Sequence, residues 1–165
     1  MTDGQELGEA AHRQLRFESI EDCVAEVNRI RDAAARETLR TSGNWTPGQN
    51  LSHVAAWINY AYDGFPITGP PWLVRWILRW RLPSILRQGM PRGVRIPGVD
   101  AGTVGMEDTS AEEACGRLSD ALARLESDEE ASFDSPAFGK MSDEDRVRLN
   151  LRHAELHLGF LVYAP

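Results

Sequence analysis

Four segments of this chain repeat apolar residues at helical spacing, and each opens on a residue that caps helices. Ser19, Thr46, Ser110 and Ser142 stand where the four patterns begin, and their hydroxyls can accept a hydrogen bond from the backbone of the first helical turn. No stretch alternates apolar and polar residues over any length, as a half-buried strand would. The sequence therefore predicts an all-α fold, a bundle of four helices.

The bounds of the four helices follow from their caps and their apolar patterns. The first is predicted from Ser19 to about residue 37. The second starts at Pro47 and ends near residue 63, with Gln49 as the capping-box partner of Thr46. The third covers residues 110 to about 125, and the last is predicted to contain about 20 residues after Ser142, roughly 30 Å of helix.

The segment between the second and third helices, residues 64–109, is far longer than the usual connection in a bundle. A tryptophan-rich helix is predicted within it from Trp72 to Leu82, where Pro83 would interrupt the backbone bonding. A stretch rich in glycine and proline follows, over residues 89–105, and is interpreted as an ordered crossover loop. Residues 1–165 are therefore predicted to form one domain, with a polar leader at 1–15 and a crossover segment at 64–109.

Composition excludes several classes of protein. With 42% hydrophobic and 26% charged residues in 165, the chain can bury a sizeable core as one globular domain. Its net charge of −7 opposes a general role in binding nucleic acid. No transmembrane segment or signal peptide is predicted, because no apolar run is long enough. The two cysteines lack a CxxC partner, which favours a cytoplasmic location.

Charge is unevenly distributed, since residues 64–99 contain six arginines and no acidic residue. Trp72, Trp76 and Trp80 recur there every four residues, beside Arg75 and Arg79. The favoured interpretation is that the tryptophans pack in the core. Alternatively, they form a contact surface for a membrane, an anionic ligand or a partner, or a lid over a pocket in which Arg75 and Arg79 bind an anion.

Histidine is the residue type that suggests chemistry. His153 and His157 are four residues apart and so share one face of the last helix, and His53 lies in the second helix. Three neutral imidazoles that converge from rigid helices suit a divalent metal. From spacing alone, this hypothesis and its alternative are about equally supported. The alternative is that each histidine is hydrogen-bonded in the core or lies at the surface. His12, in the leader, is expected to be solvated.

Several stretches of the chain resemble the DUF1569 family of the DinB-like superfamily, over about residues 16–161. They are GNWTPGQNLSHVAAWINYAYDGFP, WLVRW, GMPRGVRIPG and SPAFGKMSDEDRVRLNLRHAELHLGFL. The resemblance implies a DinB-like four-helix bundle with a long crossover between its second and third helices. It also implies a divalent metal held by His53, His153 and His157, most often zinc or nickel, with iron or manganese as further candidates.

Three protein ligands leave a coordination position open for water or substrate. The predicted function is that of a metal-dependent transferase or hydrolase acting on a small molecule, with a low-molecular-weight thiol as a cosubstrate, as in some DinB-like relatives. The alternative is a non-catalytic binding protein with a structural or vestigial metal site. The sequence leaves open whether the chain is an enzyme and whether it forms a homodimer.

Side chains around the three histidines are candidates for the pocket. Trp57 and Tyr60 share a stripe with His53, and Asn150 precedes His153 by about one turn, so these three could orient an imidazole or a bound water. The favoured interpretation, however, is a packed aromatic ring for Tyr60 and a plain surface amide for Asn150. Glu155 points away from the two nearby histidines and is expected to be a solvated charge. No catalytic residue is identified.

Overall fold

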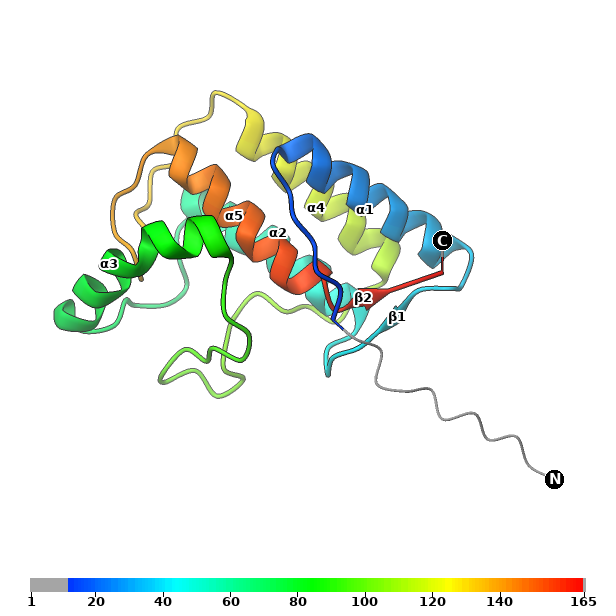
Figure 1. Ribbon diagram of the computed structural model, residues 1–165, viewed down its shortest axis with the longest axis horizontal. Helices are drawn as coiled ribbons and strands as arrows, with labels where there is room; N and C mark the ends of the chain where they lie inside the picture. The colour runs from blue at the N-terminus through cyan, green and yellow to red at the C-terminus, as the bar shows by residue number, and fades with distance from the viewer. Residues whose placement is uncertain (1–11, 165) are drawn as a thin grey trace.

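The computed structural model describes residues 12–164, so most of the predicted polar leader lies outside it. This part of the chain is mostly helical, in agreement with the all-α expectation, and contains five helices and two very short strands. In chain order these are α1 (Ile20–Ala35), β1 (Arg40–Thr41), α2 (Pro47–Asp63), α3 (Trp72–Gln88), α4 (Ala111–Glu126), α5 (Asp143–Leu158) and β2 (Leu161–Val162) (Figure 1).

All four predicted helix starts are confirmed by side-chain caps. The hydroxyls of Ser19, Thr46, Ser110 and Ser142 each accept a hydrogen bond from the backbone N–H three residues further on. At Thr46 the cap is reciprocal, because Gln49 accepts from the backbone N–H of Thr46 at 3.0 Å. These bonds satisfy amide groups that a helix start would otherwise leave unpaired.

The core lies where α2 packs against α4 and α5, and where α1 packs against α4. Each of these helices contributes apolar side chains that are almost completely buried. They include Val27 and Ile30 of α1, Leu51, Val54 and Ile58 of α2, Leu118 and Leu122 of α4, and Leu151 and Leu158 of α5. In Figure 1, α3 lies apart from α1 and α4, on the side of the molecule where α5 runs.

Two predicted helix ends are wrong. The helix that was expected to stop at Pro83 continues to Gln88. Proline removes one backbone hydrogen bond, but Leu82 is buried and Ile85 and Leu86 are half-buried, so the inner face of α3 extends past Pro83. The last helix is shorter than predicted, because it ends at Leu158 and the next residues form β2, whose Leu161 pairs antiparallel with Thr41 of β1.

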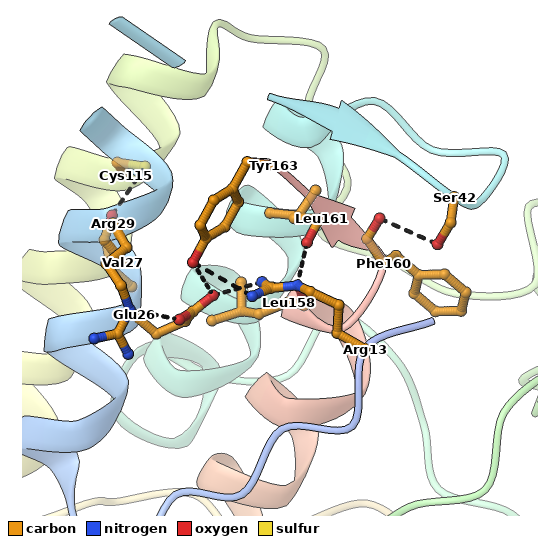
Figure 2. A network of polar contacts seen from close by, with 10 residues as sticks. All are labelled: Arg13, Glu26, Val27, Arg29, Ser42, Cys115, Leu158, Phe160, Leu161 and Tyr163. Carbon is orange, nitrogen blue, oxygen red and sulfur yellow. Dashed lines mark hydrogen bonds and ion pairs between the residues drawn. The ribbon is translucent and has the colours of Figure 1, made fainter. Parts of the chain in front are cut away.

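A buried polar network connects both ends of the described chain to α1 (Figure 2). Glu26, which is only 2% exposed, accepts hydrogen bonds from Arg13 at 2.5 Å and from the Tyr163 hydroxyl at 2.9 Å. Arg13 also donates to the backbone oxygens of Leu158 and Leu161. The network therefore holds the C-terminal end of α5 in place against α1.

The expectation that Glu155 is a solvated charge is wrong. Glu155 is 6% exposed and accepts hydrogen bonds from Arg152 and from the backbone N–H of Phe17, both at 2.6 Å. The segment before α1 covers this side of α5, which helical periodicity alone could not reveal.

No helix between residues 12 and 164 has both the length and the apolar character needed to cross a membrane.

Candidate metal centre

The three histidines proposed as ligands come together between α2 and α5. His53 comes from α2, whereas His153 and His157 lie one turn apart on α5. The Nε2 atoms of His53 and His153 are 3.1 Å apart. One nitrogen from each of the three rings lies within 4.8 Å of the others, and these rings are the one such group of possible metal ligands within residues 12–164.

Burial keeps the three imidazoles neutral. It lowers the pKa of His53 to about 4 and that of His157 to about 3, and it lowers the pKa of His153 well below the ordinary value. The desolvation cost of a charged ring is the main cause, and repulsion among the histidines adds to it for His153 and His157. Neutral imidazole is the form that binds a metal, so these side chains are ready to act as ligands at neutral pH.

The crossover segment orients His53. Nδ1 of His53 lies 2.8 Å from the backbone oxygen of Val104, to which it can donate a hydrogen bond, and Nε1 of Trp57 donates to the same oxygen at 3.2 Å. This contact assigns the proton to Nδ1 and leaves Nε2 with a free lone pair directed toward His153. The sequence contained no signal for Val104, because its contribution is a backbone atom.

Aromatic rings enclose the centre. Trp45 is stacked on His157 with 5.2 Å between ring centroids and 6° between planes, and it forms a T-shaped contact with His53 with ring centroids 5.1 Å apart. Trp57 contacts both His53 and His153, with centroids 5.9 and 5.8 Å away. Trp57 was predicted to line the pocket, whereas Trp45 precedes the second helix and lies outside its periodic pattern.

The arrangement fits a divalent metal. Two metal–nitrogen bonds of about 2.05 Å that meet at about 100° place their nitrogens about 3.1 Å apart, which matches the separation of the His53 and His153 Nε2 atoms. Within residues 12–164, Nδ1 of His157 is buried and has no hydrogen-bond partner. Hydrogen bonds within the described protein therefore leave at least one ring nitrogen of the cluster without a partner. A metal ion between the rings would bind the lone pairs of the imidazole nitrogens.

The other predicted pocket residues have different surroundings. The Asn150 amide donates to the backbone oxygen of Arg146, on its own helix, at 3.0 Å. Tyr60 is half-buried and its ring lies 5.9 Å from that of Trp57, with burial raising the pKa of its phenol. Tyr60 thus lies beside Trp57, one of the rings around the histidines, and the Asn150 amide is bonded within its own helix.

The two arginines proposed to bind an anion lie along α3. Arg79 donates hydrogen bonds to the backbone oxygens of Phe138 and Lys140, at 2.7 and 2.6 Å. Arg75 lines a surface hollow together with Phe65 and Phe133, among others. A second hollow includes Arg79 and Asp145, and no histidine of the cluster lines either one.

The expectation that His12 is solvated is wrong. His12 is half-buried, its Nε2 atom lies 2.8 Å from the backbone oxygen of Leu156, and its ring edge contacts Phe160. After burial and His53, electrostatic repulsion from His12 is a further cause of the lowered pKa of His157. The segment before α1 therefore covers the last turn of α5, close to the histidine cluster.

Comparison with known proteins gives one result. A family model described as "Protein of unknown function (DUF1569)" matches residues 9–164. No curated protein and no solved structure matches the chain at a significant level.

Proposed function

We propose that this chain, which belongs to the DUF1569 family, binds one divalent metal ion through His53, His153 and His157. The observation that carries the proposal is the convergence of three neutral imidazoles, one buried and two half-buried, two of which approach to 3.1 Å through their Nε2 atoms. Without an ion, a neutral His153 can donate an N–H···N hydrogen bond to His53 across this distance, and a shared cation would replace that bond with metal–nitrogen bonds.

The fold that we propose for this site is a DinB-like four-helix bundle made of α1, α2, α4 and α5. Its support is the packing of α2 on α4 and α5 and of α1 on α4 and α5, with α3 and its flanking loops inserted between the second and third of these helices. In such a bundle, ligands on facing helices are held rigidly, which metal binding requires.

Zinc and nickel are the ions that we propose first, with iron and manganese as further candidates. Imidazole nitrogen suits zinc, nickel and iron, whereas manganese prefers oxygen ligands. Three protein ligands leave room for an exchangeable one, and the ion could there lower the pKa of a bound water or thiol toward neutrality.

Thiol-dependent transfer is the reaction class that we favour over hydrolysis. Within residues 12–164, the group of possible metal ligands consists of histidines and contains no carboxylate. The nearby Glu155 carboxylate already accepts hydrogen bonds from Arg152 and from the backbone N–H of Phe17. A hydrolase usually needs a general base to deprotonate water, whereas a thiol has an intrinsic pKa near 8.5 and needs less assistance. Trp45 and Trp57 would exclude bulk water, and Val104 would hold His53 in its ligating tautomer.

Elemental analysis of the untagged protein by plasma mass spectrometry tests the proposal. We expect about one metal per chain, and its loss in the variant His53→Ala/His153→Ala/His157→Ala. The variant His12→Ala is the matched control, because it removes the fourth histidine of the chain and leaves the three ligands in place. Circular dichroism should show unchanged helicity in both variants.

Absence of metal from the native protein, with no binding on anaerobic titration with zinc, nickel and iron, would contradict the proposal. If metal is bound, screening thiol-transfer and hydrolytic substrates against His153→Ala would separate an enzyme from a protein whose metal is purely structural. An enzyme loses activity in this variant while its helicity is retained.

A further inference from the structure

The feature of the molecule that the metal site leaves unexplained is the outer face of α3. Its five large apolar side chains are among the most exposed in the described chain, with Trp72 and Trp80 each 78% exposed and Trp76 65%. The sequence-based preference for packing these tryptophans in the core is therefore wrong. We define the tryptophan face as Trp72, Leu73, Trp76, Ile77 and Trp80, which helical geometry places on one side of α3.

The opposite face of α3 is firmly attached to the rest of the molecule. Leu82 is 7% exposed, and the helix packs against α5. The Arg79 guanidinium holds the turn at residues 138–140 through two backbone oxygens, and Arg16 donates to the backbone oxygen of Arg87 at 2.7 Å. α3 therefore packs on the rest of the molecule through its inner face, and the tryptophan face is directed outward.

Charge distinguishes this region from the rest of the surface. Residues 64–99 contain six arginines and no acidic residue, so they contribute +6 to a chain whose total is −7 and leave −13 elsewhere. Arg81 and Arg87 are exposed on α3 and form no side-chain hydrogen bond or ion pair with other residues of the 12–164 range. The loop that follows adds Arg92 beside Val94, which is 70% exposed.

We propose that the tryptophan face docks on the surface of an anionic phospholipid bilayer. Tryptophan is favoured at the interface between lipid headgroups and hydrocarbon, and an apolar helix face with basic neighbours is the pattern of helices that lie in this interface. The arginines pair with headgroup phosphates. The acidic remainder of the chain is repelled by the same surface, so it orients the molecule with α3 toward the lipid.

Charge argues against a second copy of the chain as the occupant. Two copies that met through the same face would bring their arginine-rich segments together, without acidic residues from 64–99 to compensate them. A contact between this face and the acidic side of another copy would be heterologous, so it would produce rings or open chains of molecules rather than a symmetric dimer. An anionic bilayer satisfies both the apolar and the basic side chains at once.

Vesicle cosedimentation of the full chain tests this inference, with vesicles of phosphatidylcholine alone and of phosphatidylcholine with phosphatidylglycerol. We expect binding to the anionic vesicles that weakens as salt is added, and a blue shift of tryptophan fluorescence on binding. The variant Trp72→Ser/Trp76→Ser/Trp80→Ser should lose binding while circular dichroism shows that its helicity is retained.

Charge variants separate the contribution of the arginines. Since each basic residue near an anionic surface contributes about 1 kcal/mol, Arg81→Gln/Arg87→Gln should weaken binding about 30-fold. The matched control is Arg36→Gln/Arg40→Gln, which removes the same charge from exposed positions around the end of α1 and should have little effect.

Two results would overturn the proposal. One is failure of the native chain to bind anionic vesicles, or equal binding by the native chain and the tryptophan variant. The other is self-association of the native chain in light scattering, abolished in the tryptophan variant and accompanied by no vesicle binding. Neither result depends on the metal, because the variants leave the three histidines untouched.

Discussion

Arg152 and Glu155 form an ion pair that is buried on the side of α5 facing the segment before α1. The two side chains are 4% and 7% exposed, and Arg152 also donates to the backbone oxygen of Phe17 at 2.8 Å. In this dry environment neither charge can turn to water if its partner is lost. The pair therefore attaches the segment at residue 17 to the helix that carries two of the candidate ligands.

Replacing Glu155 should be strongly destabilising. We expect Glu155→Gln to lower the free energy of unfolding by about 3–5 kcal/mol, because it leaves the Arg152 charge buried without a counter-charge. Glu144→Gln is the matched control on the same helix, since Glu144 pairs with Arg148 in an exposed position, and its cost should stay below about 1 kcal/mol. Urea unfolding measures both, and similar values for the two variants would contradict the interpretation.

The two cysteine thiols should be unreactive in the folded protein. Burial raises the pKa of Cys23 to about 12 and that of Cys115 to about 11, so almost no thiolate forms at pH 8 and the reactive fraction grows only as the pH approaches these values. We expect neither cysteine to react with Ellman's reagent at pH 8 until urea unfolds the chain, when both should react. Rapid reaction of either thiol in native protein would show that the core opens locally.

The first turn of α2 packs closely against the backbone at the end of the crossover segment. Gly48 lies in its first turn against the end of the crossover, and a Cβ atom there would stand only 1.9 Å from the backbone oxygen of Thr109. A backbone atom cannot move aside as a flexible side chain can. This contact sets the position of α2, and with it that of His53, relative to the start of α4.

Two glycine substitutions distinguish the effect of this contact on stability from the effect of helix propensity. Gly48→Ala should destabilise the protein by about 2 kcal/mol or more, because the clash forces α2 and the crossover apart. Gly116→Ala should instead stabilise it by about 0.5–1 kcal/mol, since Gly116 lies inside α4 and nothing lies within 4 Å of a Cβ added there. Thermal unfolding of the two variants checks the prediction, and a stabilising Gly48→Ala would contradict it.

At the scale of the whole molecule, the candidate metal centre lies at the contact between α2 and α5, beside the more extensive packing of α2 on α4. The cap of α2, the network around Glu26 and the Arg152–Glu155 pair all position these helices or the segments that cover them. A metal ion shared by the two helices would therefore stabilise the folded state as a unit.

Metal should raise the melting temperature of the protein. At free zinc concentrations about 100 times the dissociation constant, binding to the folded state adds about 2.7 kcal/mol, which for a chain of this size is about 5–10 °C. We expect a chelator to reverse the shift, and the variant His153→Ala to lack it. Differential scanning calorimetry measures the effect, and an equal shift in the variant would place the metal elsewhere.

Features that depend on neighbouring residues were predictable from the sequence. The four helix starts follow from the caps at Ser19, Thr46, Ser110 and Ser142, because each cap bonds to an amide three residues away. The apolar faces of the helices follow from a period of 3.6 residues. The same periodicity placed His153 and His157 together on one face of α5, and that pairing was the local half of the candidate site.

Packing between distant segments decided the rest. His53 reaches the other two histidines only because α2 lies against α5, and its orientation comes from the Val104 backbone, 51 residues further along the chain. Glu155 is buried because the segment before α1 crosses it, and the tryptophans of α3 are exposed because the opposite face of that helix meets α5. Periodicity shows which residues share a face, whereas the tertiary structure determines which face meets the core, since that depends on the free energy of the whole packed arrangement.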